Sequence, residues 1–301
     1  MTEHRVRFDF EVDFSNGGGI QGQGFRLDIA GDDIADAELA DAIVRDLRLL
    51  MVAEVRILNK RVLVEPHKRG GLPADATVAD AVDRIVDLSH EIEDGMITYR
   101  GLPAPVICDF LSREASRELY APGTEFQIGQ ITLVSNTGTY VDVPFHRYAD
   151  GDDLADVALD RLADLPGVLV RVTGMDGRVI DRETFLPVGV RGRAVLVHTG
   201  WDRHWRTDAY FEGHPHLTAA AAGYLVEQGA ALVGIDSYNI DDVSGGERPV
   251  HTSLLGAGIP IVEHMTGLDR LPAEGFRFTA APPKVRGMGT FPVRAFARLD
   301  A

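Results

Sequence analysis

The residues best suited to chemistry gather in one segment, Ser135 to His146. Within it, Asp142 and His146 stand four residues apart around Pro144, in an apolar–polar alternation that favours an extended chain. A carboxylate and an imidazole so placed could share a metal ion, or could form a general base with its orienting partner. An ordinary loop with a capped Asp and a hydrogen-bonded His would show the same pattern, so this segment alone leaves both interpretations open.

A second pair of candidate ligands lies further along the chain. His251 and Glu263 are twelve residues apart and flank the apolar run Leu254 to Val262. Neutral imidazole and carboxylate oxygen are ligand types that suit Zn²⁺ and Mn²⁺. A single His–Glu pair is a weak signal, and it gains weight only beside another ligand such as Asp142.

The elements expected to position these residues alternate between strands and helices from about residue 79 onward. Polar residues just beyond the carboxyl ends of such strands are where α/β folds build sites. Asp236 and Ser237 hold such a place, and so does Trp201. The expected elements include a strand at Ala194–His198, a helix at Ala219–Gln228 capped by Thr218, and a strand at Ala231–Ile235.

The first seventy residues follow a different pattern. Apolar residues alternate with charged ones from Val6 to Phe14, and this period of two predicts a half-buried strand. The rest predicts a β-β-α-β-β module over residues 1–72. Its parts are a turn at Ser15–Gly24, a strand at Phe25–Ile29, a helix at Asp36–Leu50, a second hairpin around Asn59–Lys60 and a linker at His67–Pro73.

Composition bounds the class of partner. The formal net charge is −16, which argues against nucleic acid and anionic membrane as partners, because both require a positive face. The single cysteine, Cys108, permits no intramolecular disulfide and is expected to be a small buried residue. The first residues show no apolar signal segment, and no stretch reaches membrane-spanning length, so we expect a cytoplasmic protein.

The segment from Asn136 to His146 resembles the signature of the cyclase family, which includes bacterial kynurenine formamidases and isatin hydrolase. The family carries H-x-G-T-H-x-D-x-P-x-H, and this chain reads N-T-G-T-Y-V-D-V-P-F-H in the same register. Further similar stretches occur in order between Val82 and Ala297. They are Asp87–His90 with Gly95, Met96 and Tyr99, Thr199–Trp201, His214–Pro215, Gly234–Ser237, His251 with Glu263, and Pro292–Ala295.

The resemblance implies an α/β fold for residues 79–301, with a mixed β-sheet core and surrounding helices. It also implies a set of site residues. In members with two metals, the two motif histidines and the shared Asp hold the first ion, and this chain has Asn136 and Tyr140 in place of those histidines. The second ion is held by the positions that correspond to Asp142, His251 and Glu263. The resemblance assigns the general acid/base to His146.

Two kinds of chemistry follow from the resemblance. One is hydrolysis of a linear or cyclic amide with one divalent ion, Zn²⁺ or Mn²⁺, on the Asp–His–Glu set. The other needs no metal and uses Tyr140 and His146 as an acid–base pair, oriented by Asp142, for dehydration, cyclisation or isomerisation. Asn136 could serve as an oxygen ligand or as an oxyanion donor. A non-catalytic binding protein is the third alternative.

The remaining expectations concern substrate and partners. A small-molecule substrate is implied, with Trp201, Asp236 and Ser237 as candidate contacts. Family members are usually homo-oligomers whose neighbours complete one another's sites, which predicts a dimer or tetramer here. His90 is the candidate for such a contribution.

Overall fold

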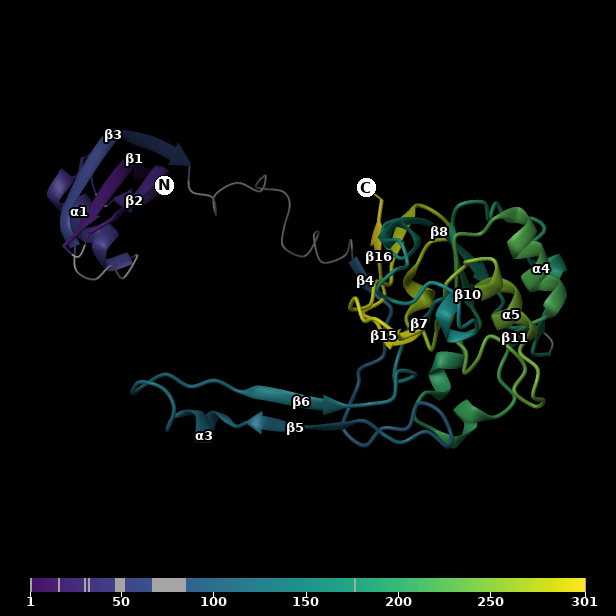
Figure 1. Ribbon diagram of the computed structural model, residues 1–301. Helices are drawn as coiled ribbons and strands as arrows, with labels where there is room; N and C mark the ends of the chain where they lie inside the picture. Colours follow the sequence, from purple (N-terminus) through teal and green to yellow (C-terminus); the bar gives the residue numbers. More distant parts are fainter. Residues whose placement is uncertain are drawn as a thin grey trace. The chain divides into compact units, whose positions relative to one another are not determined.

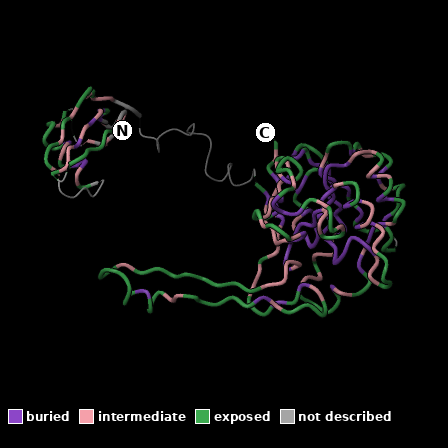
Figure 2. The backbone as a smooth tube through the Cα atoms, in the orientation of Figure 1, coloured by how far each residue is buried: buried purple, intermediate pink, exposed green. Residues whose placement is uncertain are grey.

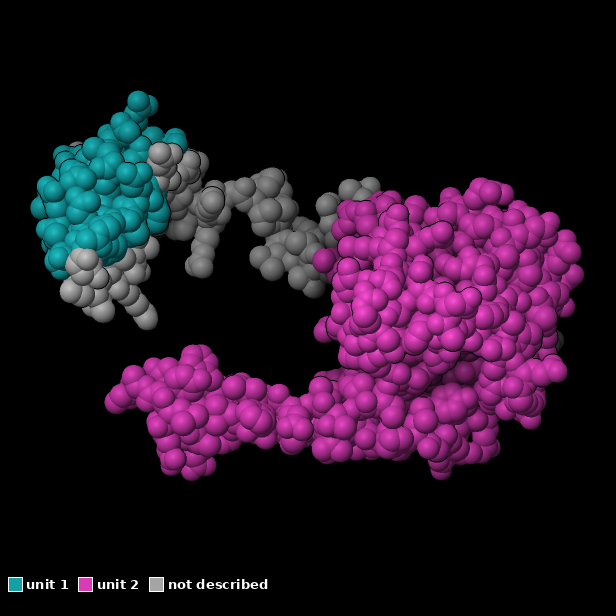
Figure 3. Space-filling view, in the orientation of Figure 1, with its two compact units in different colours: residues 1–79 teal, residues 80–301 magenta. Residues whose placement is uncertain are grey.

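The computed structural model describes residues 2–15, 17–29, 31, 33–46, 52–66, 85–175 and 177–300. The chain divides into two compact units, Met1–Ala79 and Asp80–Ala301 (Figures 1 and 3). The predicted linker His67–Pro73 and the predicted helix end at Leu47–Leu50 lie outside the described residues, as does Val82, where the family resemblance begins. The division into 1–72 and 79–301 therefore stays a prediction at its boundary.

Unit 1 is a three-stranded antiparallel sheet packed against one helix. The strands run in the order β2-β1-β3, namely β2 (Gly19–Ile29), β1 (Thr2–Phe14) and β3 (Val52–Pro66), and the helix is α1 (Asp36–Asp46). Alternate residues of β1 are buried against the apolar face of α1, as the period of two predicted. This core comprises Val6, Phe8, Phe10, Val12, Leu39 and Ile43.

The predicted second hairpin of unit 1 is wrong. β3 is one continuous strand that pairs with β1 along its length, so the module is β-β-α-β. Asn59 adopts a left-handed backbone (φ 54°) at a shift in the register, and its side-chain amide donates to the Asp9 carboxylate at 2.7 Å. Asparagine tolerates this conformation in a bulge as well as in a turn, and the sequence does not distinguish the two.

Unit 2 is built on a nine-stranded mixed sheet with helices around it, which confirms the predicted α/β class. Its strand order is β15-β7-β13-β12-β10-β8-β14-β16-β4. In that order the strands are β15 (Thr290–Pro292), β7 (Tyr140–Asp142), β13 (Ile261–Glu263), β12 (Leu232–Ile235), β10 (Ala194–His198), β8 (Leu165–Arg171), β14 (Phe276–Thr279), β16 (Phe296–Leu299) and β4 (Ile85–Asp87).

The centre of this sheet is parallel and buried on both faces. β8, β10, β12 and β13 run parallel, and successive residues of β10 alternate between two apolar clusters. Leu196 joins one cluster, whereas Val195 and Val197 join the other, together with residues of α4 (Ala219–Gln228) and α5 (Pro249–Gly256). The apolar runs read from the sequence are therefore central strands, and the buried residues gather in the body of unit 2 (Figure 2).

The elements predicted around the parallel strands are confirmed. β10 and α4 have the expected bounds, and Thr218 caps α4 by accepting from the backbone N–H of Ala221. Arg294 pairs with Asp87 at the end of β4. The short elements are β9 (Val179–Ile180), β11 (His216–Leu217) and the 3₁₀ turns η1 (Pro144–His146), η2 (Leu159–Arg161), η3 (Arg182–Thr184), η4 (Trp201–His204), η5 (Asp208–Phe211) and η6 (Leu268–Arg270).

A two-stranded arm projects from the body of unit 2 (Figures 1 and 2). It consists of β5 (Val106–Leu111), a connection with the short helix α3 (Arg113–Ser116), and β6 (Ile128–Thr132). Cys108 lies on β5 and is exposed, so the expectation of a buried cysteine is wrong. The large apolar side chains exposed on the arm are Val106, Ile107, Phe110, Leu119, Tyr120, Phe126, Ile128 and Ile131.

Among the described residues, no helix is both long enough and apolar enough to span a bilayer.

Candidate functional site

Three neighbouring strands bring the candidate residues onto one face of the sheet. β7 pairs with β13 on one side and with β15 on the other, so Tyr140 lies opposite Glu263 and Asp142 lies opposite Thr290. Alternate residues of a strand point to the same face, so Tyr140 and Asp142 share a face with their partners across the ladder. Residues about 150 positions apart in the chain thereby meet at one edge region of the sheet.

Two further side chains come from outside the sheet. His251 is supplied by α5, and His146 by η1 directly after β7. The expectation of an extended chain around Pro144 holds only to Val143, because Pro144 occupies the first turn of a 3₁₀ helix. Proline suits that position, since its fixed φ is helical and its missing N–H would be unpaired there anyway.

Asp142, His251 and Glu263 form a buried cluster of ligand atoms. All three are buried, and one ligand atom from each lies within 4.8 Å of the others. Nε2 of His251 is 3.7 Å from Oδ2 of Asp142 and 3.8 Å from Oε1 of Glu263. Oδ2 of Asp142 is buried and has no hydrogen-bond partner among the described residues. Two buried carboxylates around one imidazole leave a negative charge to be balanced, and this donor set fits a divalent cation.

The orientation of His251 is set by Asp241. Oδ2 of Asp241 lies 2.6 Å from Nδ1 of His251, and the same carboxylate accepts the backbone N–H groups of Val250 and His251. Nδ1 therefore donates its proton to Asp241, and Nε2 faces Asp142 and Glu263. Carboxylate–histidine pairs of this kind orient metal ligands in many proteins. Asp241 was not among the predicted site residues.

Glu263 accepts one hydrogen bond at each carboxylate oxygen, so each oxygen keeps a second lone pair that could bind a metal ion. The backbone N–H of Ile240 donates to Oε1 at 2.6 Å, and the hydroxyl of Tyr140 donates to Oε2 at 2.7 Å. Burial raises the pKa of Tyr140 well above its usual value, and the nearby carboxylates raise it further. Tyr140 therefore stays protonated and serves as a donor to Glu263.

Thr290 links Asp142 to His146. Its hydroxyl lies 2.5 Å from Oδ1 of Asp142 and 2.7 Å from Nδ1 of His146. Because the carboxylate can only accept, the single hydroxyl proton goes to Asp142, and Nδ1 of His146 must donate to Oγ1. In the neutral imidazole this leaves the lone pair on Nε2, and Asp142 orients the ring through Thr290 rather than directly.

The backbone beside Thr290 also supports His146. The carbonyl of Gly289 accepts the N–H of Val143 at 2.8 Å, and a Cβ added to Gly289 would overlap the backbone nitrogen and Cα of His146. Only glycine allows the residue before β15 to approach the end of η1 so closely.

The charges of the cluster shift one another. Burial raises the pKa of Glu263 to about 7, against the lowering effect of the nearby His251. Burial would lower the pKa of His251, but Glu263 and Asp142 raise it well above its usual value. Protons and a metal ion therefore compete for the same atoms.

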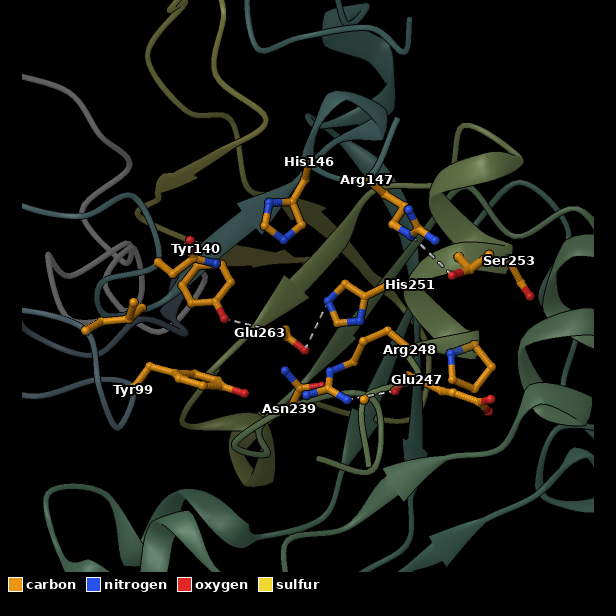
Figure 4. Close-up of a pocket in the computed structure, with 15 residues that line it drawn as sticks. Tyr99, Tyr140, His146, Arg147, Asn239, Glu247, Arg248, His251, Ser253 and Glu263 are labelled. Atoms are coloured by element: carbon orange, nitrogen blue, oxygen red, sulfur yellow. Dashed lines mark hydrogen bonds and ion pairs between the residues drawn. The ribbon is translucent and has the colours of Figure 1, made fainter. Parts of the chain in front are cut away.

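The cluster opens into a cavity of about 820 Å³ (Figure 4). This volume suits a small organic molecule. The cavity also contains residues that were not predicted, chiefly Asn239, Arg147 and Arg248. Its walls are formed by Tyr99, Leu102, Asn136, Tyr140, His146, Arg147, Asn239, Gly246, Glu247, Arg248, Pro249, His251, Thr252, Ser253 and Glu263.

The predicted substrate contacts do not line this cavity. The buried carboxylate of Asp236 accepts the N–H and hydroxyl of Thr199 and the N–H of Gly200, so it holds the turn after β10. Ser237 donates to the carbonyl of Pro215, and Nε1 of Trp201 donates to the carbonyl of Tyr210. The ring of His90 stacks on the ring of Trp205, with 4.0 Å between the ring centres. Within this chain, Trp201, Asp236 and Ser237 therefore have structural partners outside the cavity, and the contribution of His90 to a neighbouring copy's site stays a prediction.

Comparison with known proteins gives concordant results. Residues 86–242 match the model of the Cyclase family, described as "Putative cyclase". A kynurenine formamidase from Bacillus cereus is 28% identical over 215 residues, which are 71% of this chain and 96% of that protein. Isatin hydrolase A from Labrenzia aggregata, bound to benzyl benzoate, aligns with a TM-score of 0.62 at 21% identity, over 74% of this chain and 96% of that one. A predicted metal-dependent hydrolase from Bacillus stearothermophilus aligns with a TM-score of 0.56 at 26% identity, over 71% and 97%.

Proposed function

This chain belongs to the cyclase family, and from that premise we propose that it hydrolyses the C–N bond of a linear or cyclic amide in a small molecule with the help of a divalent metal ion. The observation that carries the proposal is the buried Asp142–His251–Glu263 cluster, which opens into the cavity. Bacterial relatives that match 71% of this chain over almost their whole length are kynurenine formamidases, and a similar solved structure is described as a predicted metal-dependent hydrolase.

We propose one ion per chain, either Zn²⁺ or Mn²⁺. Three protein ligands with an open position are typical of a catalytic metal site. When bound by these residues, such an ion supplies Lewis-acid polarisation of a carbonyl and lowers the pKa of water. Tyr140 stands at the place of one of the two histidines that hold the family's first ion, and its hydroxyl donates to Glu263 instead, so we take this first site to be lost.

The chain's own residues supply the proton transfers. His146 has Nε2 free as a base, because Nδ1 donates to Thr290. In this form it accepts a proton from the water that adds to the amide carbonyl, and it returns that proton to the nitrogen as the C–N bond breaks. The products are an acid and an amine or, for a cyclic amide, one ring-opened amino acid.

The metal-free alternative is less favoured. It needs the Tyr140 hydroxyl as an acid or base beside His146, but that hydroxyl is buried and committed to Glu263. A purely binding role would give no reason for the proton of His146 to be ordered by Thr290.

Elemental mass spectrometry of the purified protein tests the metal first. We expect about one Zn²⁺ or Mn²⁺ per chain, lost in His251→Ala and kept in His204→Ala, a histidine outside the cavity. His146→Ala should keep the metal and lose amide hydrolysis. A protein that takes up neither ion after dialysis against an excess of both would contradict the proposal.

We also propose that the arm of β5 and β6 packs against a second copy of the chain. A two-stranded hairpin alone is marginally stable in water, and this arm exposes apolar side chains that a partner would cover. Light scattering should show a dimer or tetramer, and Phe110→Ser with Phe126→Ser should shift it toward monomer. A wild-type monomer at micromolar concentration would contradict this assembly.

A cytoplasmic location is a further proposal. A single cysteine, with no possible disulfide partner in the chain, suits a reducing compartment.

A further inference from the structure

We propose that the substrate carries a carboxylate group and that Arg248, assisted by Arg147, binds it within the cavity. That the ligand is a substrate rests on the proposed function. That the ligand carries a carboxylate rests on the two arginines alone.

Arg248 presents a guanidinium that is fixed in place but not neutralised. Its Nη1 donates to the carbonyl oxygens of Asp242, Gly245 and Glu247 at 3.3, 2.9 and 2.7 Å. Carbonyl oxygens orient the group without cancelling its charge. Within the described part of the chain, no carboxylate forms an ion pair with Arg248, and its hydrogen bonds all come from Nη1, so the Nε and Nη2 edge can take up a ligand.

Arg147 brings a second cation to the cavity from another element. It follows directly after His146, and its Nε lies 3.4 Å from the hydroxyl of Thr252, a long contact. Its guanidinium carbon is 5.5 Å from the centre of the Tyr148 ring. Among the residues that the structure describes, it too has no ion pair, and it lines the same cavity as Arg248.

These two arginines stand out against an acidic chain with a net charge of −16. Several exposed arginines outside the cavity pair with acids, as Arg286 does with Asp156 and Arg294 with Asp87. In a chain with so many acids, an arginine in a cavity that forms no ion pair with a protein carboxylate remains available to bind the anion of a ligand.

Among the described residues that line the cavity, Glu247 is the acid that does not belong to the Asp142–His251–Glu263 cluster. It is exposed and forms no ion pair with either arginine, and Arg248 contacts its backbone carbonyl instead. Two cations therefore face one solvated carboxylate.

The cavity is thus charged in two senses. Buried carboxylates lie at the metal-ligand cluster, and arginines lie on the wall formed by the start of α5 and the residue after η1. A ligand carboxylate is attracted to the arginines and repelled by free carboxylates of the cluster, which would direct the amide of the same molecule toward His146. A planar carboxylate matches the paired donors of a guanidinium edge.

Binding without turnover tests the inference directly. Calorimetric titration of chelator-treated protein would compare benzoate, its neutral isostere benzamide, and phenyl phosphate. We expect benzoate to bind at least tenfold more tightly than benzamide, and Arg248→Gln to weaken benzoate about tenfold or more with little effect on benzamide. Arg147→Gln should have a smaller effect in the same direction. Arg161→Gln, which removes an exposed arginine outside the cavity, should stay within about twofold of wild type.

Three results would overturn the inference. They are equal affinity for benzoate and benzamide, a loss in Arg161→Gln as large as in Arg248→Gln, and tighter binding of phenyl phosphate than of benzoate. Unchanged melting temperatures of the variants would exclude misfolding as the cause of any loss.

Turnover separates this inference from the proposed function. On the metal-loaded protein, kcat/KM would be compared for 2-formamidobenzoate and 2-formamidobenzamide, which differ only in the carboxylate. We expect a preference for the acid that falls about tenfold in Arg248→Gln. Hydrolysis of both at equal efficiency would overturn the inference and keep the function. Hydrolysis of neither, with benzoate binding still dependent on Arg248, would overturn the function and keep the inference.

Discussion

Replacing Thr290 by valine should slow catalysis while leaving the fold intact. Valine has nearly the shape of threonine but lacks the hydroxyl that bridges Asp142 and His146 at 2.5 and 2.7 Å. Without it, Nδ1 of His146 loses its acceptor, and the ring is no longer held with Nε2 free for the proton transfer. The substrate cavity itself is not lined by Thr290, so KM should change little.

The magnitude follows from the lost hydrogen bonds. A hydrogen bond that involves a charged group contributes about 1.5–3 kcal/mol, and each ~1.4 kcal/mol in the barrier is a factor of about ten in rate. If the bond to His146 is the one that matters in the transition state, kcat falls by about ten- to a hundredfold.

The assay is steady-state hydrolysis of an amide substrate, with metal content measured on the same samples. Thr290→Ser should restore most of the rate, because it returns the hydroxyl. Thr207→Val, which removes an exposed hydroxyl that donates to the His204 carbonyl, should leave kcat unchanged. Wild-type kcat in a metal-loaded Thr290→Val protein would refute the role assigned to the hydroxyl.

Three more predictions concern the ion and the fold. Burial raises the pKa of Glu263 to about 7, and the nearby carboxylates raise the pKa of His251 well above its usual value, so protons must leave both groups before an ion binds. Apparent Zn²⁺ affinity, measured by chelator competition, should therefore fall at least about tenfold per pH unit below pH 7; a flat profile between pH 5.5 and 7 would contradict this. Asp241→Asn should weaken metal binding by about ten- to a hundredfold through the misorientation of His251, and unchanged affinity in a chelator titration would show that His251 needs no such partner. Asp236→Ala leaves the donors of Thr199 without an acceptor and should cost about 2–4 kcal/mol, or roughly 5–15 °C in Tm; a calorimetric Tm within one degree of wild type would contradict its structural role.

The ligand residues could be predicted because their chemistry is visible in their type. Asp142, His251 and Glu263 were expected to meet, and their ligand atoms do lie together. Thr290 and Asp241 could not be predicted in this way. A threonine or an aspartate is common on any surface, and these two matter only because of strand register and the direction of one helix.

Local signals also failed where tertiary context decides the outcome. Asn59 with Lys60 predicted a turn, yet the same asparagine serves a bulge because β1 offers a long partner for one continuous strand. Cys108 predicted burial from its type, but it lies on the arm, where large apolar side chains are exposed in the single chain. Asp236 follows a strand as site residues do, yet its carboxylate is consumed by the neighbouring turn.

Gly289 imposes a size limit on any redesign of this enzyme. A Cβ atom at position 289 would lie 2.1 Å from the backbone nitrogen of His146, so no larger residue fits there without moving that backbone. In a saturation library, substitutions at Gly289 should score with those at His146 itself, because a larger residue must move the base. Loop grafts intended to change specificity are therefore better placed on the arginine-bearing wall, where Gly245 and Gly246 have open space around them.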